Sequence, residues 1–263
     1  MKKILFTITI VLLLAAFGIS AFLVGSYLME GKEQEENYNN LASIAAAGQS
    51  ETRENAPAET DETEETTELT EPTMIPGYAE IYEMNDDTVG WIKIEGTKLD
   101  YPVMQTPDEA NYYLYRDFYG QESTRGSIYA REECDINEPS DNITIYGHNM
   151  ADGSMFAALN AYVNKSAWEN NSLIFFDTLT EYHTYKIFAV FKTSANIGEG
   201  FSYHQFVDAE NEEEFKEFVS TCKELAFYDT GITPVYGDKI ICLSTCEYTL
   251  NNGRLVVAAV RIT

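Results

Sequence analysis

Basic residues are scarce in this chain of 263 residues. It carries 17 Lys and Arg against 43 Asp and Glu, and its formal net charge is −26 at pH 7. Proteins that bind nucleic acid usually present a basic patch or stripe, often interleaved with aromatic side chains. The sequence contains no such stripe. We therefore exclude nucleic acid as a partner.

Histidine is rarer still, with three in the whole chain. None of them has another His or a Cys at a spacing that metal sites use. The sequence therefore predicts no metal site, and we expect no cofactor. His183 and His204 lie among polar residues and are interpreted as solvated surface side chains.

Cysteine is limited to four residues, which could form two disulfides in an oxidising compartment. If the segment around them is extended, Cys242 and Cys246 lie ~13 Å apart, too far for a disulfide bond. Cys242 stands in an apolar run and Cys222 in a helical pattern, so both are predicted to be core residues. Cys134 lies in a polar loop and has no predicted role. Cys246 alone ends a strand-like run at a turn.

Charge is absent from residues 4–29, a run of 26 residues. At ~1.5 Å per helical residue the run reaches about 39 Å, which exceeds a hydrocarbon core of ~30 Å. A cleaved signal peptide is the competing interpretation, but its apolar region is usually ~7–15 residues long, and no clear small-x-small site precedes Glu30. We therefore predict an uncleaved anchor over 1–29. Lys2 and Lys3 place the N-terminus in the cytoplasm and the rest of the chain outside the cell.

Residues 30–75 carry 13 acidic and 2 basic residues and almost no aromatic ones. Such a segment buries too little apolar surface to offset the entropy lost on ordering, so we predict a disordered, self-repelling acidic stalk. The stalk would act as a spacer between the membrane and the next domain. We expect removal of residues 1–75 to leave a folded domain.

Residues 76–263 form one domain that is long enough for a substantial core. Apolar alternation bounded by turn residues predicts many strands, and helical spacing appears at 78–84, 153–163 and 211–226. Many strands with few helices favour a mostly β barrel or sandwich over a doubly wound sheet. The predicted strands are 89–94, 98–104, 126–130, 142–147, 172–177, 184–194, 238–245 and 254–262.

Three residues have the chemistry needed for acyl transfer by a thiol. At an unperturbed pKa of ~8.5 only about 3% of a thiol is ionised at pH 7, so Cys246 would need a proton acceptor. His148, which follows a predicted strand and a glycine, could accept that proton and later protonate a leaving amine. Arg254 could stabilise the negative charge that develops on the carbonyl oxygen.

The placement of Cys246 and Arg254 depends on the turn between them. The connecting segment contains Asn252-Gly253, a pair that suits a hairpin. A hairpin centred on Leu250 would put Cys246 opposite Arg254 on one face, whereas a tight turn at Asn252-Gly253 would lose that register. The sequence does not decide between the two turns.

These residues resemble the signature of class B sortases, the membrane-anchored cysteine transpeptidases of Gram-positive bacteria. The family signature TLxTC with a downstream Arg appears here as LSTC, ending at Cys246 and followed by Arg254. The segment YGHNM around His148 is similar to the catalytic histidine segment of the family. The resemblance covers roughly 77–263, and the helical pattern at 211–226 looks like the class B insertion. Cys242 stands where the family commonly has Thr.

The resemblance implies a closed eight-stranded β-barrel with peripheral helices, preceded by the transmembrane helix. It also implies that Cys246 attacks a C-terminal sorting signal of surface proteins, with His148 as general acid and base and Arg254 as oxyanion or substrate clamp. The thioester would then pass to an amine of a peptidoglycan precursor or of a pilin lysine. Ser244 and Thr245 are the candidate substrate-binding residues, although Thr245 could instead orient the loop or simply pack.

Two other classes of protein compete with this interpretation. A non-enzymatic stalked adhesin or pilus-like module fits the anchor, the stalk and the β-rich domain. The only evidence against it is the presence of Cys246, His148 and Arg254. Among other cysteine enzymes, an L,D-transpeptidase would show an S-x-G-C-like motif, which is missing. A papain-like peptidase usually places its Cys before its His, the reverse of the order here.

Overall fold

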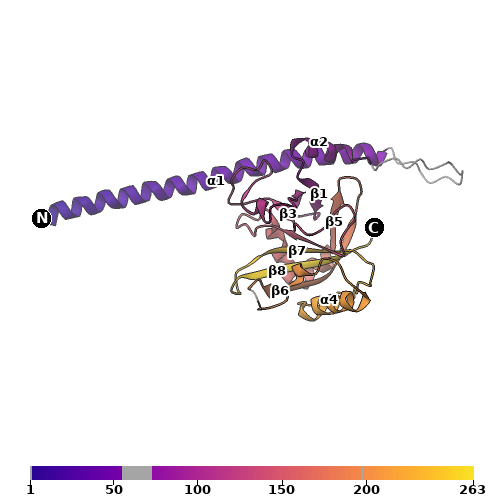
Figure 1. Cartoon of the computed structure of the whole chain (residues 1–263). Coiled ribbons are helices and arrows are strands. Elements are labelled where there is room, and N and C mark those ends of the chain that lie inside the picture. Colours follow the sequence, from indigo (N-terminus) through magenta and orange to yellow (C-terminus); the bar gives the residue numbers. More distant parts are fainter. Residues whose placement is uncertain (1, 55–72, 197) are drawn as a thin grey trace, which may run out of the picture. The chain divides into compact units, whose positions relative to one another are not determined.

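The computed structural model describes residues 2–54, 73–196 and 198–263. The chain divides into two compact units, Met1–Asn40 and Leu41–Thr263. The first unit consists of most of one long helix, α1, and the second contains everything else (Figure 1). Within α1, Phe6–Gly48 meets the length and composition of a membrane-spanning helix. This agrees with the predicted anchor, although a signal sequence near the N-terminus has the same properties.

Eight strands of the described residues close into a barrel in the order β1-β2-β3-β4-β7-β8-β6-β5. Most neighbours are antiparallel, but β2 pairs with β3 and β4 with β7 in parallel. The predicted mostly β, closed eight-stranded barrel with peripheral helices is confirmed, and each predicted strand run corresponds to one observed strand. The strands are β1 Thr88–Lys93, β2 Asp100–Met104, β3 Ile128–Ala130, β4 Asn142–Tyr146, β5 Leu173–Thr178, β6 Thr184–Ser194, β7 Ile240–Glu247 and β8 Gly253–Arg261.

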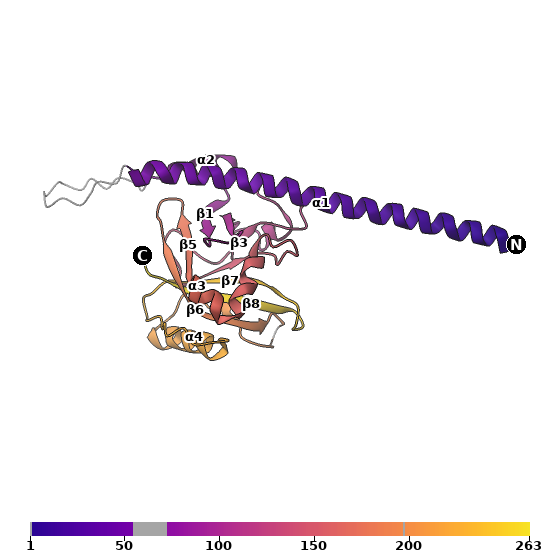
Figure 2. The ribbon, with the colours of Figure 1, turned by 180° about the vertical axis from the view of Figure 1, so that it is seen from behind.

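Helices of the second unit lie around this barrel and not inside it (Figure 2). The segment predicted to be helical at 153–163 is a 3-10 helix that begins at Phe156, and the short helix α3 was not predicted. The helical elements are α1 Lys2–Glu54, α2 Pro76–Met84, η1 Tyr112–Tyr115, η2 Phe156–Val163, α3 Lys165–Asn170, η3 Tyr203–Gln205 and α4 Glu212–Leu225.

Helix α4 begins where the sequence predicts, because Asn211 caps it by accepting hydrogen bonds from the backbone N–H groups of Glu213 and Glu214. Its apolar side, which includes Phe215 and Cys222, packs against one face of the sheet formed by β6, β7 and β8. Both views show α4 alongside β6 and β8 (Figures 1 and 2). Cys222 and Cys242 are fully buried in this layer, so the prediction that both are core residues is confirmed.

The prediction of disorder over residues 30–54 is wrong, because these residues continue α1. Leu41 and Ala45 in this part of the helix are buried, at 0% and 2% exposure. A Cβ added to Gly48 would lie 2.0 Å from the backbone nitrogen of Gly77, so α1 and α2 meet backbone to backbone. The acidic composition of the whole segment concealed this small apolar stripe. Residues 55–72 of the predicted stalk lie outside the described residues.

Candidate active site

The ends of β7 and β8 bring two of the predicted residues together. In the antiparallel pairing of these strands Cys246 lies directly opposite Arg254. The hairpin is therefore centred on Leu250, and the tight turn at Asn252-Gly253 is excluded. Because directly opposite residues share a face of the sheet, the thiol and the guanidinium project to the same side.

That side of β7 is also the side on which α4 packs. Every second residue of a strand points to the same face, so the side chains of Cys242, Ser244 and Cys246 share one face of β7. Cys242 belongs to the layer buried under α4. The strand extends beyond this layer, so Ser244 is still buried while Cys246 is partly exposed. The thiol therefore stands at the point where the buried sheet opens to solvent.

His148 reaches the same region from β4, which pairs in parallel with β7 so that Tyr146 is next to Ser244. Gly147 follows, and a Cβ there would lie 2.7 Å from Cγ of Phe156, so a larger residue would have to displace that ring. The Nε2 atom of His148 is 2.8 Å from the carbonyl oxygen of Leu114. A carbonyl can only accept, so Nε2 carries the proton and, in the neutral ring, Nδ1 is left as the basic nitrogen.

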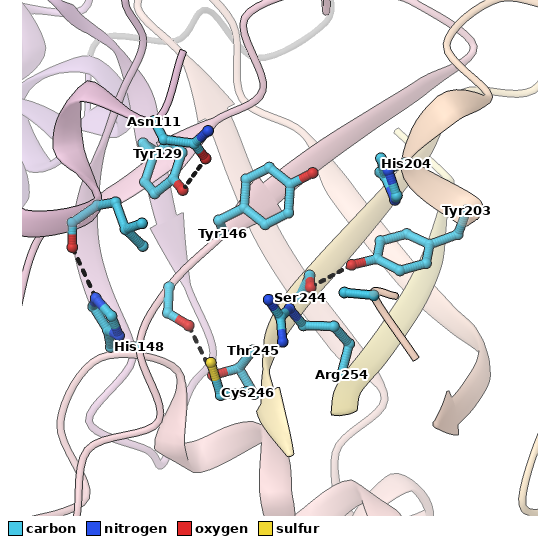
Figure 3. A pocket seen from close by; sticks show the side chains of 13 residues that line it. Asn111, Tyr129, Tyr146, His148, Tyr203, His204, Ser244, Thr245, Cys246 and Arg254 are labelled. Atoms are coloured by element: carbon cyan, nitrogen blue, oxygen red, sulfur yellow. Dashed lines mark hydrogen bonds between the residues drawn. The ribbon is translucent and has the colours of Figure 1, made fainter. Parts of the chain in front are cut away.

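A pocket of about 240 Å³ joins these three residues (Figure 3). Its walls come from η1 and the residue before it, from the ends of β3, β4 and β7, from the start of β8 and from the chain between β6 and α4. Besides Cys246, His148 and Arg254, the lining residues are Asn111, Leu114, Tyr129, Tyr146, Gly147, Ala195, Tyr203, His204, Ser244 and Thr245.

Arg254 makes no ion pair with any described residue. Its Nη1 atom donates instead to oxygens of its own turn: the backbone oxygen of Gly253 at 3.0 Å, and the side-chain and backbone oxygens of Asn252 at 3.1 and 3.4 Å. Although the chain is rich in carboxylates, none in its described part neutralises this guanidinium. The positive charge remains available to a ligand in the pocket.

Ser244 and Thr245, the two candidate substrate-binding residues, both line the pocket and are both almost fully buried. The Ser244 hydroxyl is 2.5 Å from the phenolic oxygen of Tyr203. Burial raises the pKa of Tyr203 to about 12, so this phenol stays protonated at neutral pH. The hydroxyl of Thr245 donates to the carbonyl oxygen of Gly147 at 2.7 Å, on the residue before His148.

Two histidines are placed differently from the prediction that they are solvated surface residues. His204 lines the pocket, and burial, together with the charges of Arg131 and Arg254, lowers its pKa. The side chain of His183 is only 10% exposed, and burial and Arg261 lower its pKa as well. Local sequence gave no sign of this, because the charges that lower both pKa values, Arg131 and Arg254 for His204 and Arg261 for His183, come from distant segments.

Glu247 is a residue of the site that sequence reasoning missed. Its carboxylate accepts from Lys192 at 2.7 Å and from the backbone N–H groups of Thr249 and Leu250 at 3.0 and 3.1 Å. Desolvation raises the pKa of Glu247, but these hydrogen bonds outweigh it and lower the pKa to about 2. An ionised Glu247 therefore stabilises the five-residue loop that sets the register of Cys246 and Arg254.

The four cysteines are free, so the two possible disulfides are not formed. Cys134 lies in a loop, as predicted, but it is buried, and its thiol is 3.5 Å from the carbonyl oxygen of Asn142. Burial raises the pKa of Cys134 to about 11. Among the described residues no group of three or more His, Cys, Asp or Glu could hold a metal ion.

Comparison with known proteins decides which family this arrangement represents. Residues 92–262 match the model of the sortase domain. The chain belongs to the sortase family. It is 32% identical over 188 residues to sortase B of Listeria monocytogenes, covering 70% of this chain and 73% of the relative. It is 27% identical to sortase B of Staphylococcus aureus, covering 98% of this chain and 97% of the relative.

Solved structures agree with this assignment. A structure of a Staphylococcus aureus sortase B–substrate complex matches with a TM-score of 0.76 and 28% identity, covering 89% of this chain and 99% of that one. The resemblance to class B sortases is confirmed, and the chain is a class B sortase, a cysteine transpeptidase. The alternative of a non-enzymatic adhesin or pilus-like module is thereby excluded.

Proposed function

We propose that this sortase cleaves the C-terminal sorting signal of surface proteins through a thioester on Cys246 and transfers the acyl group to an amine. The observation that carries the proposal is the cross-strand pairing of Cys246 with Arg254 at the mouth of a pocket that His148 also lines. The match with a sortase B–substrate complex supports a peptide as the occupant of that pocket.

In the first half-reaction the sulfur of Cys246 attacks the scissile carbonyl carbon, and the thiol proton passes to Nδ1 of His148. The carbon–nitrogen bond then breaks, His148 returns the proton to the leaving amine, and a thioester remains. In the second half-reaction the acceptor amine attacks the thioester and gives its proton to His148. The carbon–sulfur bond breaks, and the thiol is restored by the proton on His148.

Arg254 is assigned to the oxygen of the scissile carbonyl, which becomes negative in both tetrahedral intermediates. A guanidinium can direct two parallel N–H donors at such an oxygen or at neighbouring carbonyls. Because Arg254 has no ionic partner among the described residues, its charge is not already neutralised within the site. Removal of one positioned oxyanion donor typically lowers kcat by about 10²–10³.

Ser244 and Thr245 are assigned different parts in substrate binding. Ser244 faces the pocket and is bonded to Tyr203, so this pair forms a polar wall against which a peptide could rest. The Thr245 hydroxyl is occupied by Gly147, so we assign Thr245 to orienting the His148 segment and not to direct contact through its side chain.

The surroundings of the enzyme follow from its N-terminal helix. We propose that residues 4–29 anchor the chain in the cell membrane with the N-terminus in the cytoplasm and the catalytic domain, residues 76–263, outside. Its partners would be surface proteins that carry a sorting signal, and an amine from a peptidoglycan precursor or a pilin. The residues of the site call for no cofactor in this chemistry.

A cleavage assay tests the proposal. The full chain, purified in detergent, is incubated with a small library of sorting peptides, with and without an amine acceptor. We expect cleavage of some peptides, formation of an amide product when an amine is added, and no turnover by Cys246→Ala. Cleavage that persists in Cys246→Ala would refute the proposed mechanism.

A further inference from the structure

We infer that Asn252 is a positioning residue that fixes the guanidinium of Arg254 and joins the β7–β8 loop to the pocket wall after β6. The inference rests on the proposed role of Arg254 in stabilising the oxyanion. It adds a residue that does not itself touch the reacting atoms and lies at the tip of the catalytic hairpin.

The backbone of Asn252 is in a conformation that few residue types adopt readily. Its φ angle is +50°, in the left-handed region. Outside glycine, this region is populated mainly by Asn and Asp. A glycine would serve this backbone at least as well, so the conformation alone does not explain why an asparagine side chain stands here.

The side chain of Asn252 uses both ends of its amide. The oxygen accepts from Nη1 of Arg254 at 3.1 Å, and the nitrogen donates to Oδ1 of Asn196 at 3.3 Å. The amide of Asn196 in turn donates to Glu199 at 2.8 Å. An amide is needed for this arrangement because one group must accept from the arginine and donate to the opposite loop.

Backbone contacts place the same two loops in register. The carbonyl oxygen of Asn252 accepts from the backbone N–H of Ala195 at 3.0 Å, and the oxygen of Asn251 accepts from the hydroxyl of Ser194 at 3.3 Å. Ala195 lines the catalytic pocket. Asn252 therefore connects two walls of the pocket, one that carries the guanidinium and one that continues toward Tyr203 and His204.

This connection matters because no carboxylate of the described residues forms an ion pair with Arg254. A partly exposed arginine has several rotatable bonds, and their rotamer freedom is lost when the side chain is fixed. A donor contributes most to catalysis when its position is set before the reaction begins. The hydrogen bonds to Asn252 and Gly253 select the rotamers in which the guanidinium stays beside the pocket.

Single-turnover acylation by a peptide that the parent cleaves tests the inference. Asn252→Gly keeps the left-handed backbone and removes the amide, and Asn252→Asp keeps the acceptor for Arg254. We expect Asn252→Gly to lower the acylation rate at saturating peptide by about tenfold to 100-fold, with little change in half-saturation or melting temperature. Asn252→Asp keeps an acceptor for Arg254 but loses the donor to Asn196 and neutralises the guanidinium, so it should also acylate at least about tenfold more slowly than the parent. Asn251→Gly, on the neighbouring loop residue, is the matched control and should acylate at the parental rate.

A double-mutant cycle separates this inference from the proposed function. In an Arg254→Lys background, Asn252→Gly should change the rate by less than about twofold, because the group that Asn252 positions is already lost. If Arg254→Lys slows acylation strongly but Asn252→Gly alone does not, or if the two losses multiply, the inference is wrong while the role of Arg254 stands. If Arg254→Lys itself acylates normally, both are overturned. Should Asn252→Gly fold poorly, Asn196→Ala removes the same link from the other loop and replaces it in the cycle.

Discussion

The hydroxyl of Thr245 donates a hydrogen bond of 2.7 Å to the carbonyl oxygen of Gly147. This bond ties the strand that ends in Cys246 to the turn that precedes His148. Cys246 and His148, which exchange a proton in the proposed mechanism, follow or end strands more than ninety residues apart in sequence. Their relative position depends on a small number of such contacts at the open end of the β4–β7 pair.

Replacement of Thr245 by valine removes this bond while the volume of the side chain is retained. Thr245 is 2% exposed, so we expect a loss of about 1 kcal/mol of unfolding free energy. We also expect a fall in acylation rate of about tenfold, because the His148 segment is less well held. Thr245→Ser keeps the hydroxyl and is the control. Chemical denaturation measures the change in stability, and single-turnover kinetics measure the acylation rate. If Thr245→Val acylates as fast as the parent, the bond contributes to stability only and does not position His148.

Arg254→Lys tests the guanidinium itself. We expect this variant to fold with an almost unchanged melting temperature and to lose at least ~100-fold in acylation rate, because an ammonium cannot offer two parallel donors. Arg261 lies on the same strand, at the end away from the hairpin, so Arg261→Lys is the matched control. If Arg254→Lys acylates within about threefold of the parent, Arg254 acts only as a surface charge.

The four cysteines should separate into one functional and three structural residues. Cys246→Ala should abolish cleavage. Cys222→Ala and Cys242→Ala should lower the unfolding free energy by ~1 kcal/mol, because each removes one buried sulfur from the layer under α4. Cys134→Ala should leave activity intact. Loss of cleavage in a folded Cys222, Cys242 or Cys134 variant would show that the nucleophile has been misassigned.

Truncation should show where the stable unit begins. A chain that starts at residue 41 keeps Leu41, Ala45 and the contact between Gly48 and Gly77, whereas a chain that starts at residue 76 loses them. Burial of one leucine contributes about 2 kcal/mol. We therefore expect the chain 41–263 to be more stable than the chain 76–263 by about 2 kcal/mol or more in urea denaturation. Equal stability would mean that the end of α1 adds nothing to the barrel.

The two partly buried histidines, His183 and His204, predict a pH dependence of stability. Burial lowers the pKa of His183, with Arg261 adding to the effect, and it lowers that of His204, with Arg131 and Arg254 adding to it. The unfolded chain, with an ordinary histidine pKa of ~6.5, therefore binds more protons than the folded one just below that pH, so stability falls as pH decreases. Glu247 and Asp152, whose pKa values are about 2, stay ionised in this range and add no slope. Urea midpoints between pH 7.5 and 5.5 measure the effect, and His183→Gln combined with His204→Gln should flatten the slope.

The barrel could be predicted from sequence because its strands alternate regularly. The run that ends at Cys246 and the run that begins at Arg254 were both recognised from their apolar residues, within two residues of their observed ends. The register between them could not be predicted, since Asn252-Gly253 suits a tight turn as well as a longer loop. Glu247 favours the longer loop, because its carboxylate accepts from the N–H groups of Thr249 and Leu250. A single acidic residue does not indicate such a loop in a sequence.

Two other features depended on contacts that no local pattern shows. His204 and Tyr203 reach the pocket because the side chain of Asn142, some sixty residues earlier, donates to the backbone oxygens of Tyr203 and Phe206. The end of α1 is ordered by its contact with Gly77. In both cases the average polarity of the segment suggested exposure, while a few long-range contacts determine the structure.

The measurement that tests the account most directly is the intact mass of the protein during reaction with a sorting peptide in the absence of an amine acceptor. We predict a transient increase equal to the mass of the peptide's acyl portion, located on Cys246 by proteolytic mapping and removed by hydroxylamine. Addition of an acceptor amine should discharge it into an amide product. Cleavage of the peptide with the adduct on another residue, or with no adduct in rapid-quench samples, would contradict a mechanism that depends on Cys246 facing Arg254.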